Sequence, residues 1–225
     1  MIEQTADFCV AAKPNEQYVH GLTPQQHQKL TNFIQKHGLF SIYDCKLSDI
    51  RDTAQSALFH YHRWGYDTIT VSPFPGNTEE VVRIAHEYDP QIGIIVLTLM
   101  SNPEAERFMR HARIGNKPAY LAIAEDVRKF GADGCVVGAT GHVTEKDLKL
   151  IRATVGEDKL FLIPGVGAQR GDPERAIKAG GRNIIINVGR DIIYSDNPRR
   201  KAKEYCELFR KIRCSTEHSV IKRTT

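Results

Sequence analysis

The feature that most constrains the fold is an alternation, along almost the whole chain, of short apolar runs and longer segments with helical periodicity. The apolar runs are continuous, which is typical of strands in a parallel sheet whose two faces are both covered by helices. Several helical segments begin with a capping residue and proline or with acidic residues, as at Thr23-Pro24 and Asn77-Thr78-Glu79-Glu80. The alternation therefore predicts an α/β protein made of successive βα units. The expected strands cover residues 8–12, 40–44, 68–71, 92–97, 135–137, 160–163 and 183–188, and the expected helices cover 23–37, 52–63, 104–113, 119–130, 146–155, 173–179 and 197–212, with one more helix beginning at 77.

The number of strands decides between two α/β architectures. The chain has 225 residues, enough for one sizeable core, and supplies about seven strands, whereas a closed parallel barrel needs eight. We expect a (β/α)8 TIM barrel lacking its first strand, which would precede Met1. An open doubly wound sheet is the alternative, but polar residues follow nearly every strand instead of gathering at one crossing point. We expect one barrel domain over residues 1–213 and a flexible polar tail over 214–225.

Composition and charge restrict the class of protein. The net charge of +4 is small and no block of basic residues occurs, so the charge suits an anionic small molecule and gives no reason to expect a nucleic-acid partner. No apolar run approaches the length of a membrane span, and the N-terminus has no signal-peptide pattern, so we expect no membrane partner. The five cysteines are odd in number and include no CxxC pair, which indicates neither a disulfide framework nor a zinc site. These observations predict a reduced, cytoplasmic protein.

A row of charged residues at the end of the expected strand 40–44 is the first candidate site. Asp44 and Lys46 share one face of the strand because side chains alternate, and Asp49 follows where the chain turns. Cys45, between them, points the opposite way and is expected to face a covering helix. Buried charges are costly unless they are paired, so the row is either a structural ion network or a functional site.

Two glycine-rich stretches after the last two expected strands are candidates for a phosphate site. They are Gly165-Val166-Gly167-Ala168-Gln169 and Val188-Gly189-Arg190. Barrels often hold phosphate in the loops after strands 7 and 8, where glycines let backbone N–H groups approach the anion and arginine offers a fixed fork of donors. Each stretch alone favours a tight loop, but the two together, with the arginine, predict a phosphate site.

Polar residues at two further strand ends complete the candidate site. Lys13 follows the strand at 8–12, and Met100-Ser101-Asn102-Pro103 follows the strand at 92–97. Lysines and aspartates that share a pocket hold each other ionised. Two carboxylates would disfavour a substrate carboxylate beside them, and a lysine could deliver a proton when that carboxylate leaves. The hydroxyl and apolar surface after residue 99 suit a flat heterocycle.

The combined motifs resemble the orotidine 5′-monophosphate decarboxylase family. They are Asp44-x-Lys46-x-x-Asp49-Ile50-x-x-Thr53 and the two glycine-rich stretches, and Lys13-Pro14-Asn15 is similar to the second-strand lysine segment of one branch of the family. DxKxxD alone also occurs in related sugar-phosphate decarboxylases and aldolases, whereas its combination with GVGAQ and VGR is highly specific. The resemblance covers residues 1–212.

The resemblance implies a homodimeric (β/α)8 barrel that converts orotidine 5′-monophosphate (OMP) to UMP and CO₂ in pyrimidine biosynthesis. Such a carboxy-lyase uses no metal and no organic cofactor. Lys46 would protonate C6 of the pyrimidine, Asp44 would repel the substrate carboxylate, and Asp49, Ile50 and Thr53 would reach the partner's active site. The implied catalytic residues are Lys13, Asp44, Lys46 and Asp49, and the implied substrate-binding residues are Ile50, Thr53, Met100, Ser101, Pro164, Val166, Gln169, Gly189 and Arg190.

Two other functions remain open. A sugar-phosphate decarboxylase or formaldehyde-fixing aldolase on the same barrel needs a magnesium-binding acid near the DxKxxD strand, where Ile42 and Tyr43 offer none.

The first strand of the orotidine 5′-monophosphate decarboxylase family ends in an aspartate that contacts the ribose, and Asp7 lies on the wrong side of Lys13 to replace it. The second alternative is therefore a non-catalytic barrel that binds a phosphate ligand or serves as a scaffold.

Overall fold

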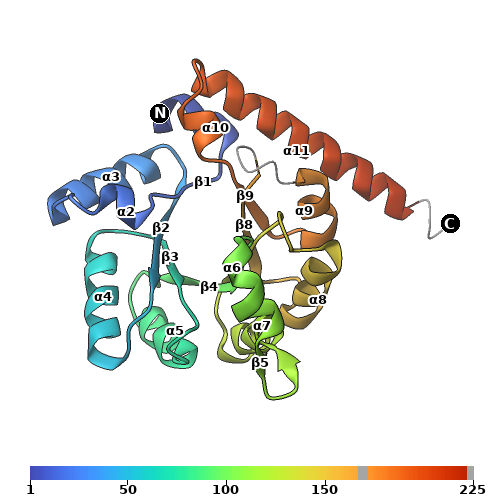
Figure 1. The fold of residues 1–225 in the computed structure, drawn as a ribbon. Coiled ribbons are helices and arrows are strands. Elements are labelled where there is room, and N and C mark those ends of the chain that lie inside the picture. Colours follow the sequence, from blue (N-terminus) through green and yellow to red (C-terminus); the bar gives the residue numbers. More distant parts are fainter. Residues whose placement is uncertain (167–171, 222–225) are drawn as a thin grey trace.

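The computed structural model describes residues 1–166 and 172–221, with side chains described as far as residue 216. In the described residues, seven parallel strands form one sheet, in which each strand pairs with its neighbours in chain order. The sheet curls around a central axis and the helices lie on its outer side (Figure 1). The expected barrel is therefore confirmed, and the strand order lacks the reversal of a doubly wound sheet. The strands are β1 (Ala11–Ala12), β2 (Phe40–Leu47), β3 (Thr68–Val71), β4 (Gly93–Leu99), β7 (Gly134–Val137), β8 (Leu160–Pro164) and β9 (Ile184–Asn187).

The helices begin where their capping residues place them. The Thr23 hydroxyl accepts a hydrogen bond from the Gln26 N–H at 3.3 Å, and the Gln26 side chain accepts one from the Thr23 N–H at 2.8 Å. This reciprocal capping box satisfies N–H groups that have no partner inside the helix. Thr144 and Asp147 repeat the arrangement. The helices that cover the sheet are α3 (Pro24–Lys36), α4 (Arg51–Arg63), α5 (Thr78–His86), α7 (Ala119–Phe130), α8 (Glu145–Val155), α9 (Pro173–Gly180) and α11 (Pro198–Ile221).

Two apolar clusters form the core of the protein, one on each face of the sheet. Successive side chains of a strand point to opposite faces, so β4 sends Ile94 and Val96 outward and Ile95 and Leu97 inward. The outer cluster lies between the sheet and its helices, and the inner one fills the barrel centre. Both are buried, as the continuous apolar runs of the sequence require. The inner cluster consists of Ile42, Ile95, Leu97, Val136 and Leu162.

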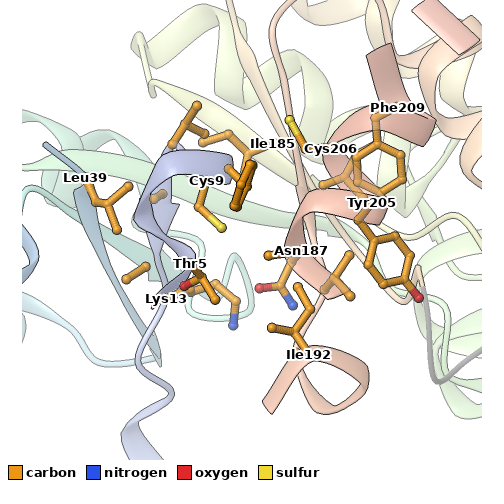
Figure 2. Close-up of a pocket in the computed structure, with 18 of the residues that line it drawn as sticks. Thr5, Cys9, Lys13, Leu39, Ile185, Asn187, Ile192, Tyr205, Cys206 and Phe209 are labelled. Carbon is orange, nitrogen blue, oxygen red and sulfur yellow. The ribbon is translucent and has the colours of Figure 1, made fainter. Parts of the chain in front are cut away.

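The sheet has an open seam between β1 and β9. Within the described residues, β1 pairs with β2 alone and β9 with β8 alone, which agrees with a barrel that is short of one strand. A cavity of about 440 Å³ lies along the seam, between residues such as Cys9 beside β1 and Ile185 on β9 (Figure 2). Lys13 and Asn187 lie at the same end of this cavity.

Several elements differ from the expected ones. Ala6–Phe8 forms a 3₁₀ turn, η1, after the short helix α1 (Ile2–Thr5), so the first strand is shorter than expected. The expected helix 104–113 is divided into α6 (Pro103–Ala105) and a π-helix, η2 (Glu106–His111). The other additions are α2 (Glu16–Val19), α10 (Arg190–Ile193) and the antiparallel pair β5 (Arg113–Ile114) and β6 (Lys117–Pro118).

The C-terminal helix is longer than the sequence suggested. We expected α11 to end near residue 212, but it continues to Ile221 through part of the expected flexible tail. No glycine or proline follows Pro198 to stop it, and the hydroxyls of Ser215 and Thr216 donate back to the Ile212 carbonyl at 2.7 and 2.9 Å. Residues 222–225 lie outside the described part of the chain. None of the described helices is both long and apolar enough to cross a membrane.

A buried arginine joins the last helices to the sheet. Arg152 of α8 is only 5% exposed, and its guanidinium lies 3.7 Å from the centroid of the Phe161 ring. Its N–H groups donate to backbone carbonyls at the ends of several neighbouring elements. A buried guanidinium needs such acceptors, because its N–H groups have given up their hydrogen bonds to water. The acceptors are the carbonyls of Gly156, Lys159, Gly180 and Asn183, at 2.6–3.2 Å.

We predict that Arg152→Met lowers the free energy of unfolding by about 3 kcal/mol or more, because the hydrogen bonds of a buried guanidinium to four backbone carbonyls are lost. Urea denaturation followed by circular dichroism measures the change. The control is Arg128→Met, which removes an exposed arginine with one long hydrogen bond of 3.4 Å and should change stability by less than about 0.5 kcal/mol. Equal midpoint shifts in the two variants would contradict the assigned role.

Candidate active site

The charged row predicted at the end of β2 lies within the strand. β2 continues to Leu47, and its pairing with β3 shifts register between Tyr43 and Leu47. Such an irregularity re-aims side chains, and Lys46 here adopts a φ of 52°. Lys46 Nζ lies 2.7 Å from Asp44 Oδ1. Cys45 packs towards the covering helices, as expected.

Lys13 reaches Asp44 because the chain after β1 continues beside β2. The Asp44 N–H donates to the Pro14 carbonyl at 2.9 Å, and Asn15 forms a parallel bridge with Asp44. This pairing brings the Lys13 ammonium into an ion pair with Asp44 Oδ2. The side chains of Lys13 and Asp44 are 14% and 12% exposed, so salt screens their attraction only weakly. The structure thus brings together three of the four expected catalytic residues.

Two residues that the sequence did not indicate complete the surroundings of Asp44. The Thr70 hydroxyl donates to Asp44 Oδ1 at 3.1 Å and accepts a hydrogen bond from the Lys46 N–H at 2.9 Å. Asn15 Nδ2 donates to Asp44 Oδ2 at 3.2 Å. Asn15 belongs to the Lys13-Pro14-Asn15 segment and Thr70 to the expected strand 68–71, but nothing in their spacing indicates a contact with Asp44.

The surroundings of Asp44 keep it ionised. Burial alone would raise the pKa of this carboxyl group. The attraction and hydrogen bonds of Lys13 and Lys46 outweigh burial and hold the pKa of Asp44 well below its usual range. The site therefore presents a fixed negative charge between two ammonium groups.

Among the described residues, no hydrogen bond or ion pair joins Asp49, Ile50 or Thr53 to this cluster. An Asp49 carboxylate oxygen accepts a hydrogen bond from the Ile50 N–H at 2.9 Å, and the Asp49 carbonyl accepts one from the Asn77 side chain at 2.9 Å. Ile50 is 51% exposed and Thr53 is also exposed. This segment thus presents a carboxylate, an apolar side chain and a hydroxyl outward. Among the described residues, no group of three or more His, Cys, Asp or Glu side chains is placed to hold a metal ion.

Met100 and Ser101 follow β4 and lie against the loop after β7. The Met100 N–H lies 3.3 Å from the Met109 sulfur. A Cβ added to Gly138 would lie 2.6 Å from Ser101 Cβ, so only glycine allows this approach. The position of Ser101 therefore depends on the neighbouring loop as well as on β4.

The two glycine-rich stretches follow neighbouring strands. Pro164 of β8 pairs with Asn187 of β9, which brings the loops after both strands to one edge of the sheet. Val166 is buried, and Arg190 begins α10. Gly189 and Lys13 line the same cavity along the seam. Gln169 lies outside the described residues.

We predict that the pH dependence of stability reports the ionised state of Asp44. Its pKa is lowered in the folded protein, so its stabilising contribution is present above its unfolded pKa and is lost as the pH falls towards the folded value. The stability of wild type relative to Asp44→Asn should therefore decrease when the pH is lowered from about 7 to about 3. Urea unfolding at several pH values measures this difference.

Asp126→Asn is the control for this experiment. Burial raises the pKa of Asp126 in the folded protein, so its favourable contribution exists at low pH and is lost as the pH rises through the folded value. Wild type should therefore gain relative to Asp126→Asn on acidification. A change of the same sign for both variants would contradict the assignment.

Comparison with known proteins places the sequence in one family. Residues 2–205 match the family described as "Orotidine 5'-phosphate decarboxylase / HUMPS family". The chain is 33% identical to orotidine 5′-phosphate decarboxylase of Cupriavidus taiwanensis, over 98% of this chain and 81% of the relative. It is 34% identical to the protein of the same name from Thermomicrobium roseum, over 96% and 79%.

Solved structures give the same result. The Leishmania donovani UMP synthase structure matches with a TM-score of 0.81 and 30% identity, over 94% of this chain and 48% of that chain. This chain therefore spans about half the length of that protein. Orotidine 5′-monophosphate decarboxylase of Methanocaldococcus jannaschii, complexed with inhibitor BMP, matches with a TM-score of 0.78 and 26% identity, over 92% and 90%. The chain belongs to the orotidine 5′-phosphate decarboxylase / HUMPS family.

Proposed function

We propose that this chain is an orotidine 5′-monophosphate decarboxylase, a carboxy-lyase that converts OMP to UMP and CO₂. The observation that carries the proposal is the cluster of Lys13, Asp44 and Lys46 at the strand ends of a barrel in that family. Lys46 is the more accessible lysine, with 39% of its side chain exposed, so a bound ligand can reach it. Fixed charges of both signs are suited to a reaction in which negative charge moves from a carboxylate to a ring carbon.

The proposed step breaks the bond between C6 of the pyrimidine and the carboxyl carbon. The electron pair of that bond stays on C6, CO₂ leaves, and the Lys46 ammonium transfers a proton to C6. Asp44 repels the substrate carboxylate, and this repulsion disappears as CO₂ departs. Interactions that favour the transition state over the bound substrate accelerate the reaction. The step uses only side chains of the protein, with no organic cofactor and no metal.

The remaining contacts are assigned by position. Ser101 would hydrogen-bond the pyrimidine, and Arg190 would grip the 5′-phosphate, with Gly189 admitting it closely. Binding energy from the distant phosphate would then help to organise the charged row around the ring. The proposed substrate-binding residues are Ile50, Thr53, Met100, Ser101, Pro164, Val166, Gln169, Gly189 and Arg190.

We infer further that the enzyme acts as a homodimer. The exposure of Asp49, Ile50 and Thr53 supports this inference, because exposed side chains are available to a partner subunit. In a dimer, they would complete the active site of the partner subunit. Residues 1–213 would form one catalytic domain, acting in the cytoplasm on a small-molecule substrate in UMP biosynthesis, with no nucleic-acid or membrane partner.

We predict that Lys46→Ala lowers kcat by about 10²- to 10⁴-fold, the usual contribution of a proton donor, and changes UMP affinity by less than about tenfold. Loss of OMP absorbance measures turnover, and isothermal titration measures binding. Arg190→Ala is the contrasting variant, because loss of a phosphate contact should chiefly raise KM. Turnover close to wild type in Lys46→Ala would exclude this lysine as the proton donor.

A second prediction follows from the proposal that each active site takes residues from both subunits. Mixing inactive Lys46→Ala and Asp49→Ala proteins should restore roughly a quarter of wild-type activity, because about half of randomly formed dimers are mixed and each holds one intact site. Lys46→Ala mixed with Asp44→Ala is the control and should recover nothing, since both residues serve the same subunit's site. Equal activity in the two mixtures would refute the exchange of residues between subunits.

A further inference from the structure

The π-helix η2 contacts the strand end that carries Ser101. It follows β4 and α6, and its residue Met109 places its sulfur 3.3 Å from the Met100 N–H. π-helical turns are rare and are frequent at functional sites, because the extra residue redirects the side chains that follow it. Here the next side chain along, that of Arg110, reaches the loop after β7.

Arg110 ties that loop, and the first turn of α8 that follows it, to η2. Its Nη2 donates to the His142 carbonyl at 2.7 Å and forms an ion pair with Asp147. Asp147 is 6% exposed and also accepts hydrogen bonds from the Thr144 N–H at 2.7 Å and the Tyr120 hydroxyl at 3.1 Å. A guanidinium holds two acceptors at once in a fixed geometry, which an ammonium does not.

The loop held by Arg110 approaches Ser101 closely at two residues, Gly138 and Gly141. Gly138 approaches so closely that an added Cβ would lie 2.6 Å from Ser101 Cβ, and its N–H donates to the Leu99 carbonyl at 2.8 Å. An added Cβ on Gly141, whose φ is 58°, would lie 2.8 Å from the Ser101 carbonyl oxygen. The loop therefore limits the positions that Ser101 can adopt, and the hydrogen bond from Arg110 holds the loop in place.

We propose that Arg110 is a positioning residue for the nucleobase end of the active site. It acts through the 138–142 loop to hold Ser101 where its hydroxyl meets the pyrimidine, and it touches no substrate itself. This role rests on the proposed function, which assigns Ser101 to the ring. It predicts that loss of the Arg110 geometry weakens binding of ligands that have a pyrimidine and spares ligands that have only the ribose phosphate.

The test is a double-mutant cycle in the full-length protein, with dissociation constants for UMP and for ribose 5-phosphate. Arg110→Lys and Ser101→Ala should each weaken UMP binding by about tenfold, the usual effect of losing one hydrogen bond, and change ribose 5-phosphate binding less than about twofold. The double variant should bind UMP about as weakly as either single variant, because the two residues act on one contact. Arg107→Lys, an exposed arginine of the same π-helix, should bind both ligands like wild type.

Two results would overturn the role of Arg110. One is an equal loss of UMP and ribose 5-phosphate binding in Arg110→Lys, and the other is multiplication of the two single effects in the double variant. If Arg110→Lys does not fold, Arg110→Met combined with Asp147→Leu replaces the buried ion pair by apolar groups and should show the same selective loss. Wild type that binds UMP no more tightly than ribose 5-phosphate would instead refute the proposed function, and the role of Arg110 with it.

Discussion

The structure depends on the compensation of one largely buried carboxylate, Asp44. An ionised carboxylate removed from water is destabilising by several kcal/mol unless opposite charges and hydrogen bonds surround it. Here the partners come from three adjacent strand ends: Lys13 after β1, Lys46 on β2 and Thr70 on β3. Because each partner must reach the same two oxygen atoms, the charge requirement also fixes the relative positions of the three strands.

The same requirement explains the unusual backbone at the end of β2. Lys46 has a φ of 52° and Arg51 a φ of 47°, conformations that cost of order 1–3 kcal/mol each for residues other than glycine. Lys46 retains its conformation while its side chain bonds Asp44 and its N–H bonds the Thr70 hydroxyl. The segment between Lys46 and Arg51 is the one that carries Asp49 outward. The DxKxxD motif therefore has one half, Asp44 and Lys46, that pairs within the barrel and another, Asp49, that is exposed.

Much of this arrangement follows from sequence, and the part that does not has physical reasons. The apolar runs predict the strands, and the period of two predicts that Asp44 and Lys46 share a face, because these properties are local. The contacts of Thr70 and Asn15 with Asp44 depend on the register between strands, which no single segment encodes. The π-helix at 106–111 depends on packing around Met100. The polarity of the residues after 212 predicts fraying, but no glycine or proline there stops a helix, and α11 continues to Ile221.

The two halves of the candidate site, the charged row at Lys13 and the stretch at Gly189, lie on opposite sides of the seam between β1 and β9. Lys13 and Gly189 line one cavity. In the described residues, however, backbone pairing connects β1 to β9 only through the five strands between them, β2, β3, β4, β7 and β8. Across the seam, the Arg199 guanidinium of α11 pairs with Asp7 at 2.7 Å and lies 5.3 Å from the centroid of the Phe8 ring. Both charged side chains are more than half exposed, and such pairs contribute less than about 1 kcal/mol.

The two sides of the seam are therefore held together mainly by apolar packing of the N-terminal segment against α11, around a cavity of about 440 Å³. The charged row is held together by ion pairs and hydrogen bonds among residues of β2, β3 and the segment after β1. Its distance from Gly189 and Arg190 after β9 is set by the curvature of the whole sheet. A substitution anywhere in the inner cluster around Ile95 and Leu97 that changed this curvature would move Arg190 relative to Lys46 without touching either residue.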